Sequence, residues 1–117
     1  MTDWKNKKSV LAAVQKDGYV LKNADESLKK DKSIVLEAVM YSGGGAMEFA
    51  DKSLLKDKVF ILEALKKSGN GYLLKYVDES FRKDKSIVLA AVKQDGDALK
   101  YADESLKKDP DIIKAAK

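Results

Sequence analysis

The stretch DKSIVLAAVKQDGDALKYADESLKKD, residues 84–109, decides the fold, because the same phrase returns along the chain. An aspartate opens an apolar helix, a glycine interrupts the pattern, and a second aspartate opens a shorter amphipathic segment. Related phrases open at positions 6, 31, 57 and 109. Self-similarity at a nearly fixed period is the signature of stacked repeat units. We therefore expect an all-α solenoid.

The chain divides into four complete repeats of about 25 residues and a closing half repeat. The complete repeats cover residues 6–30, 31–56, 57–83 and 84–108, and residues 109–117 form the first helix of a fifth. All length differences fall just after one glycine in each repeat, as expected when stacked repeats share a core and vary along one edge. We predict one short, curved helical-repeat domain over residues 1–117.

Each repeat is predicted to hold a long first helix, a short second helix and a single turn. A polar residue that can act as N-cap precedes each first helix, because its side-chain oxygen can accept a free backbone N–H. These N-caps are Asn6, Asp31, Asp57, Asp84 and Asp109. A second set opens the single turns: Asp25, Asp51, Asp78 and Asp103. For turns this short we expect partly 3-10 geometry.

A glycine follows each first helix, and we expect it to end that helix in the left-handed conformation. The glycines are Gly18, Gly43, Gly69 and Gly96.

The composition excludes several classes of function. The 117 residues include neither cysteine nor histidine, so disulfides, thiol nucleophiles, Cys/His zinc sites and the usual neutral-pH proton shuttle are ruled out. We expect no enzyme, no cofactor and no metal site. The net charge is +4, and no apolar run suits a signal peptide or a membrane span. We expect a cytoplasmic protein with no membrane partner.

The phrase at residues 84–109 resembles the bacterial and protozoal repeat family named domain of unknown function 4116 (DUF4116). The shared features are an Asp-led IVLAAV helix, a glycine, ALKYA and a leucine before the next aspartate. The resemblance extends over residues 6–117 and is loosest at MYSGGGAMEFA, residues 40–50. The chain is also similar to leucine-rich variant repeats, which alternate α and 3-10 helices in a curved solenoid. Both resemblances imply a fold, the first is to a family of bacterial and protozoal proteins, and neither implies a catalytic activity.

Departures from the repeat are the candidate binding positions. Met40 and Tyr41 stand late in a first helix, where the other repeats carry glutamine or lysine. Methionine and tyrosine are both common in protein interfaces, so we predict an exposed contact patch. Local packing over the following glycine-rich loop is the alternative, since isolated exposed apolar residues are common.

Two loops are predicted to form the variable rim of the binding edge. One contains Gly43, Gly44 and Gly45, and the other is GNGY at residues 69–72, which exposes Asn70 or Tyr72. Successive glycine N–H groups can cradle a phosphate, but a P-loop also needs Gly-Lys-Ser/Thr. A flexible helix connector is the simpler interpretation of the triple glycine.

Two repeated patterns are open to two interpretations each. An aromatic position recurs at Phe49, Tyr76 and Tyr101, as a base-stacking platform or as half-buried core. Lys–Asp–Lys recurs at residues 30–32, 56–58 and 83–85, as a phosphate-binding edge or as a solvated edge of mixed charge.

The combined prediction is a non-catalytic module for protein–protein interaction, acting as a scaffold, an adaptor or an inhibitor surface. Its predicted binding residues are Met40, Tyr41, Gly44, Gly45, Asn70 and Tyr72. The alternative is binding of a nucleic-acid phosphate backbone through the lysine-rich edge. A monomer is expected, or a weak dimer that associates through the helix at 109–117.

Overall fold

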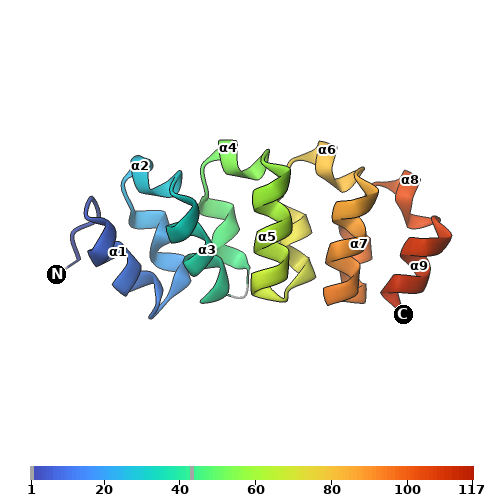
Figure 1. Cartoon of the computed structure of the whole chain (residues 1–117), viewed down its shortest axis with the longest axis horizontal. Coiled ribbons are helices and arrows are strands. Elements are labelled where there is room, and N and C mark those ends of the chain that lie inside the picture. The colour runs from blue at the N-terminus through green and yellow to red at the C-terminus, as the bar shows by residue number, and fades with distance from the viewer. Residues whose placement is uncertain (1, 43) are drawn as a thin grey trace.

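A computed structural model describes residues 2–42 and 44–117 of the chain. The molecule is an elongated stack with extents of 50 × 23 × 17 Å (Figure 1). The described residues form α-helices and 3-10 helices (η) and no strand. The structure thus confirms the predicted all-α repeat solenoid.

Three rows of helices run along the stack. The long first helices lie side by side (Figure 1); they are α1 (Lys7–Val14), α3 (Lys32–Met40), α5 (Lys58–Ser68), α7 (Lys85–Gln94) and α9 (Pro110–Ala116). The 3-10 helices pack in a second row, made of η1 (Gly18–Asn23), η2 (Gly45–Phe49), η3 (Gly71–Tyr76) and η4 (Gly96–Tyr101). Single-turn helices form a third row along one edge, namely α2 (Glu26–Lys29), α4 (Lys52–Leu55), α6 (Glu79–Arg82) and α8 (Glu104–Lys107).

The predicted N-caps are confirmed at every first helix. Each side-chain oxygen accepts a backbone N–H of the first turn, as Asp84 does from Ser86 at 2.9 Å. The aspartates before the single-turn helices do the same, as Asp25 does from Ser27 at 3.1 Å. Pro110 occupies the first turn of α9, where its missing N–H has no intrahelical partner to lose.

The 3-10 helices lie in segments for which no 3-10 geometry was predicted, the middle segments η1 to η4, whereas the single-turn helices are classed as α-helical. In η1, the Val20 N–H bonds to the Asp17 carbonyl and the Ala24 N–H to the Leu21 carbonyl, each spanning three residues. The single turn α2 contains both kinds of bond, because the Asp25 carbonyl accepts the Leu28 N–H at 2.9 Å and the Lys29 N–H at 3.2 Å. The partly 3-10 geometry predicted for the single turns is therefore present in α2.

The predicted left-handed glycine at the end of a first helix is confirmed at Gly69 and differs at Gly18 and Gly96. In the described residues, positive φ occurs only at Gly44 (98°) and Gly69 (62°). Gly18 and Gly96 are needed for a different reason, a close backbone approach: a Cβ there would lie 2.0 Å from the carbonyl oxygens of Ala38 and Ala116. These glycines let the η row touch the first helix of the next repeat. Gly43 lies outside the described residues.

One continuous apolar core connects the repeats. Phe60, Leu73, Leu74 and Ile87 are fully buried, and the described residues include no buried charged side chain. A backbone hydrogen bond also ties each complete repeat to the segment that precedes it, from the cap before its single-turn helix. The four N–H groups belong to Asp25, Asp51, Asp78 and Asp103, and their acceptors are the carbonyls of Trp4, Lys29, Leu55 and Arg82. Each repeat is therefore held by its immediate neighbours, as in other solenoids.

Candidate functional site

A groove opens along the η row, and we call it the tyrosine groove. It encloses about 200 Å³. Its lining residues are Tyr19, Gly44, Gly45, Asn70, Tyr72, Lys75, Tyr76 and Tyr101. The groove thus brings together four of the predicted binding residues, which come from two loops about 25 residues apart in the sequence.

Gly45 makes room for one wall of the groove. A Cβ at Gly45 would lie 2.2 Å from the hydroxyl oxygen of Tyr19. Counted back from the next N-cap aspartate, the same position holds Tyr19, Tyr72 and Asp97 in the other repeats. The Tyr19 ring uses the space that a side chain would fill there, and it remains 47% exposed.

The opposite wall is a set of tyrosine rings in fixed contact. Tyr72 and Tyr101 meet edge to face, with ring centroids 5.9 Å apart and an interplanar angle of 73°, a favoured aromatic geometry. The Lys100 Nζ lies 5.5 Å from the centroid of Tyr72 and 5.2 Å from that of Tyr101. Lys75 lies in the same way over Tyr76, at 5.5 Å. These cation–π contacts limit the movement of the rings.

The Tyr72 hydroxyl stays protonated at neutral pH. The negative charge of Asp95, together with partial burial and Asp97, raises the pKa of Tyr72 above its ordinary value. The hydroxyl can therefore donate a hydrogen bond to a ligand. The backbone beneath it is fixed as well, because Asn70 accepts the Tyr72 N–H at 2.8 Å and caps η3.

Met40 and Tyr41 lie outside the groove but next to it. Their side chains are 45% and 50% exposed at the end of α3, so the predicted exposure is confirmed. The Tyr41 carbonyl accepts the N–H of Gly18 at 3.3 Å, which places Tyr41 beside the residue that precedes Tyr19. The structure thus brings four of the six predicted residues together in the groove and leaves Met40 and Tyr41 exposed outside it.

The sequence interpretation missed Tyr19 and Lys75 as groove residues. Tyr19 could have been found by aligning the repeats on the aspartates that precede the single-turn helices. In that alignment Tyr19 has the same position as Gly45 and Tyr72, which were predicted as binding residues. The half-buried interpretation of Phe49, Tyr76 and Tyr101 is confirmed, because all three pack against the core without being fully covered. Two of these rings nevertheless face the groove.

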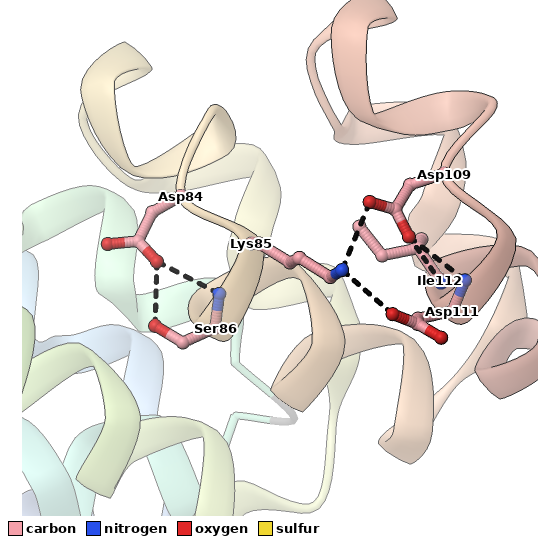
Figure 2. A network of polar contacts seen from close by, with 6 residues as sticks. All are labelled: Asp84, Lys85, Ser86, Asp109, Asp111 and Ile112. Atoms are coloured by element: carbon pink, nitrogen blue, oxygen red, sulfur yellow. Dashed lines mark hydrogen bonds and ion pairs between the residues drawn. The ribbon is translucent and has the colours of Figure 1, made fainter.

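Half of the lysines of the predicted lysine-rich edge, Lys32, Lys58 and Lys85, join Lys7 in a ladder of ion pairs between repeats. The first residue of each first helix reaches the N-cap aspartate of the next repeat. The pairs are Lys7–Asp31 at 3.1 Å, Lys32–Asp57 at 3.1 Å, Lys58–Asp84 at 2.8 Å and Lys85–Asp109 at 3.2 Å. Figure 2 shows the last of them, where Lys85 also meets Asp111 at 2.8 Å.

These contacts shift the ionisation of both partners. Hydrogen bonds from Lys58 and then from the Ser86 hydroxyl lower the pKa of Asp84 to about 2. Hydrogen bonds to Asp111 and Asp109 raise the pKa of Lys85. The lysines of the ladder are therefore neutralised by carboxylates at the same edge.

Residues 2–42 and 44–117 lack two other kinds of site. That part of the chain contains no group of three or more acidic, His or Cys side chains placed to hold a metal ion. It also contains no helix with both the length and the apolarity needed to cross a membrane. The carboxylate of Asp95 caps η4, because it accepts the Asp97 N–H at 3.0 Å.

Comparison with known protein families agrees with this architecture. The profile of the family described as Domain of unknown function (DUF4116) matches four overlapping segments, residues 6–44, 41–82, 68–107 and 84–116. Together they cover nearly the whole chain, so the chain belongs to the DUF4116 family. Comparison with curated proteins and with solved structures gives no significant match.

Proposed function

We propose that the chain is a non-catalytic helical-repeat module of the bacterial cytoplasm that binds a protein partner through the tyrosine groove and the adjoining Met40 and Tyr41. The observation that carries this proposal is the convergence of Gly44, Gly45, Asn70 and Tyr72 on one groove. Tyrosine and methionine are enriched where proteins meet, and the other repeats lack a comparable pair at the Met40–Tyr41 position.

The size of the groove favours a protein ligand. Sites for small molecules and cofactors usually enclose about 300–1,000 Å³, and the tyrosine groove encloses about 200 Å³. This volume suits one or two side chains of a partner. Rings already held by the Tyr72–Tyr101 contact lose little freedom on binding, which lowers the entropic cost of association.

The proposal is tested by quantitative affinity capture from extracts of the source organism with matched variants. Tyr72→Asp places in the third repeat the residue that the fourth carries at Asp97, and Met40→Lys with Tyr41→Lys restores the polar column. Each should reduce the captured partner at least about tenfold, as expected for interface anchors.

Val59→Ser is the matched control. Val59 is 72% exposed and lies outside the groove, so it tests whether capture depends on exposed apolar area alone. Capture should be unchanged in this variant. If all these variants retain the partner while circular dichroism shows them folded, the proposal is wrong.

Phosphate-backbone binding is the alternative, and salt dependence separates the two. Backbone binding predicts an affinity that falls steeply as salt rises, whereas an aromatic anchor predicts a weak dependence. The pairing of Lys7, Lys32, Lys58 and Lys85 with carboxylates argues against a free basic edge. Filter binding to single- and double-stranded DNA across a salt series should show no saturable complex.

Self-association through α9 is a separate prediction. Ile113 is 36% exposed on this helix, and an exposed apolar side chain on a terminal helix can stack on a second copy. Sedimentation velocity over a concentration series should show a monomer or a weak dimer, and Ile113→Lys should remove any dimer. A dimer that survives this substitution would place the contact elsewhere.

A further inference from the structure

A second groove is lined by residues of α5 and α7. These are the neighbouring first helices of the third and fourth repeats (Figure 1). The groove encloses about 380 Å³ and we call it the α5–α7 groove. Its apolar part is formed by Leu62, Leu65, Leu89 and Ala90, and Lys66 and Lys93 also line it. These residues belong to the row of first helices, whereas the tyrosine groove belongs to the η row.

The residue at one position of the repeat helps to keep this groove open. Ala90 stands where α3 carries Glu37 and α5 carries Glu63, whereas α1 and α9 also carry alanine there, Ala12 and Ala115. Alanine leaves room above the leucines that a glutamate side chain would cover, and it removes a carboxylate from the groove. The remaining glutamate on this side, Glu63, pairs with Lys67 at 3.6 Å.

The charge of the groove is therefore of one sign. Both lysines, Lys66 and Lys93, are exposed at the carboxyl ends of their helices. Within residues 2–42 and 44–117, no carboxylate oxygen lies within 4.0 Å of either Nζ. No acidic residue lines the groove. Apolar walls with two unneutralised lysines at one end are complementary to a ligand that is apolar and acidic.

We propose that the α5–α7 groove binds a short amphipathic helix of a protein partner, with an apolar stripe on Leu62 and Leu89 and acidic side chains facing Lys66 and Lys93. The groove is lined from Ser86 to Gln94 on α7 and from Leu62 to Lys66 on α5, about 12 and 6 Å of helix at 1.5 Å per residue. The longer span matches about two turns of a docked helix, which would use apolar residues at i, i+4 and i+7. Opposite charges at the rim fix the orientation and favour this partner over basic ones.

The test uses two labelled probes and the full chain. One is a fluorescein-labelled helical peptide of about three to four turns, with a leucine stripe flanked by glutamates, and the other carries lysine at every glutamate position. Fluorescence anisotropy should give an affinity for the glutamate peptide at least about tenfold higher than for the lysine peptide. Equal affinities, or no binding of the glutamate peptide at about 1 mM, would overturn the proposal.

Matched variants locate the binding. Ala90→Glu should weaken the glutamate peptide at least about tenfold, and it should fold because Glu63 occupies the same column. Ala12→Glu makes the same change in the first repeat and should have no effect. Lys66→Glu with Lys93→Glu should reverse the preference between the peptides, while Lys8→Glu with Lys16→Glu should not.

Peptide binding at the α5–α7 groove can be distinguished from binding at the tyrosine groove. Tyr72→Asp should leave the peptide affinity unchanged. If Tyr72→Asp abolishes binding while Ala90→Glu does not, the peptide occupies the tyrosine groove and the α5–α7 proposal fails. If Ala90→Glu abolishes peptide binding while Tyr72→Asp does not, the α5–α7 proposal holds, whether or not the tyrosine groove binds a partner.

Discussion

The edge that carries the ion-pair ladder and the edge that carries the tyrosine groove follow the repeat to different degrees. Along the ladder, the equivalent lysine of each repeat forms an ion pair with the N-cap aspartate of the next repeat. Along the groove, the column that contains Tyr19 changes to Gly45, Tyr72 and Asp97 in successive repeats. The ladder edge is therefore uniform from repeat to repeat, and the groove edge, which we call the individual edge, varies from repeat to repeat.

The difference has a physical origin. Each repeat stacks on the next in nearly the same geometry, so a contact that stabilises one interface stabilises all of them. Residues that make these contacts recur. A binding surface has no such partner within the chain, and its residues can differ from repeat to repeat. In this molecule, uniform columns stabilise the stack and departures shape the surface.

The largest expected effect is that of Gly71→Ala, a change in a uniform position. A Cβ at Gly71 would lie 2.2 Å from the carbonyl oxygen of Ala91, which is backbone of the neighbouring first helix and cannot move aside alone. We expect the free energy of unfolding to fall by about 3 kcal/mol or more, measured by urea denaturation. A loss below about 1 kcal/mol would show that the η row can separate from α7 at little cost.

The next effect is expected at Asp84. Its pKa is about 2 in the folded chain against an ordinary value of 3.8, so its contribution to stability is present above pH 4 and is lost as the pH falls toward 2. The shift corresponds to about 2 kcal/mol at most; we expect about 1 kcal/mol for Asp84→Asn at pH 7 because Lys58 is half exposed.

The check is urea denaturation of wild type and Asp84→Asn at pH 7 and at pH 2. The difference between the two proteins should shrink at the lower pH. Lys58→Gln is the partner control and should raise the pKa of Asp84. A stability difference that is the same at both pH values would show that the ionised Asp84 carboxylate does not stabilise the fold through the ladder.

A smaller, stabilising effect is expected for Val59→Ser. The equivalent serines Ser33 and Ser86 donate their hydroxyls to the N-cap aspartates at 2.6 Å, and Val59 leaves Asp57 without that bond. The substitution should add about 0.5–1 kcal/mol and raise the midpoint of thermal unfolding. No gain would mean that the exposed valine makes a contact of comparable value.

The smallest effect is expected for Gly45→Ala, a change in the individual edge. The new Cβ would meet the hydroxyl end of the Tyr19 side chain, which is flexible and exposed, so the ring can turn away. We expect the free energy of unfolding to change by less than about 0.5 kcal/mol, together with a change in Tyr19 fluorescence or chemical shift. A large loss of stability would show that the groove is part of the packing.

The local features of the fold were predictable from the sequence. N-caps such as Asp31 and Asp84 depend on residues two or three positions away, and the periodicity of the repeat requires stacking. The resemblance to leucine-rich variant repeats implied 3-10 helices, but not their place at η1, where Gly18 lies against Ala38 of the next repeat. Conformations set by a distant backbone carry no local signature.

The candidate site was predictable only in part. Column departures identified Gly45 and Tyr72, but not that Tyr19 occupies the space above Gly45. The sequence left two interpretations open for the lysine-rich edge, and neither included ion pairs between repeats, because the partner of Lys85 lies about one full repeat later at Asp109. Both features are contacts between repeats, and these become visible only when the repeats are stacked.

The most direct test of the central claim is site-specific photo-crosslinking. Tyr72 and, in a separate variant, Val59 are replaced with p-benzoyl-L-phenylalanine, and each protein is irradiated in extracts of the source organism. A position in the tyrosine groove should form a discrete cross-linked protein product, whereas position 59, although 72% exposed, should not. The same products from both positions, or a product from position 59 alone, would contradict the assignment of binding to the individual edge.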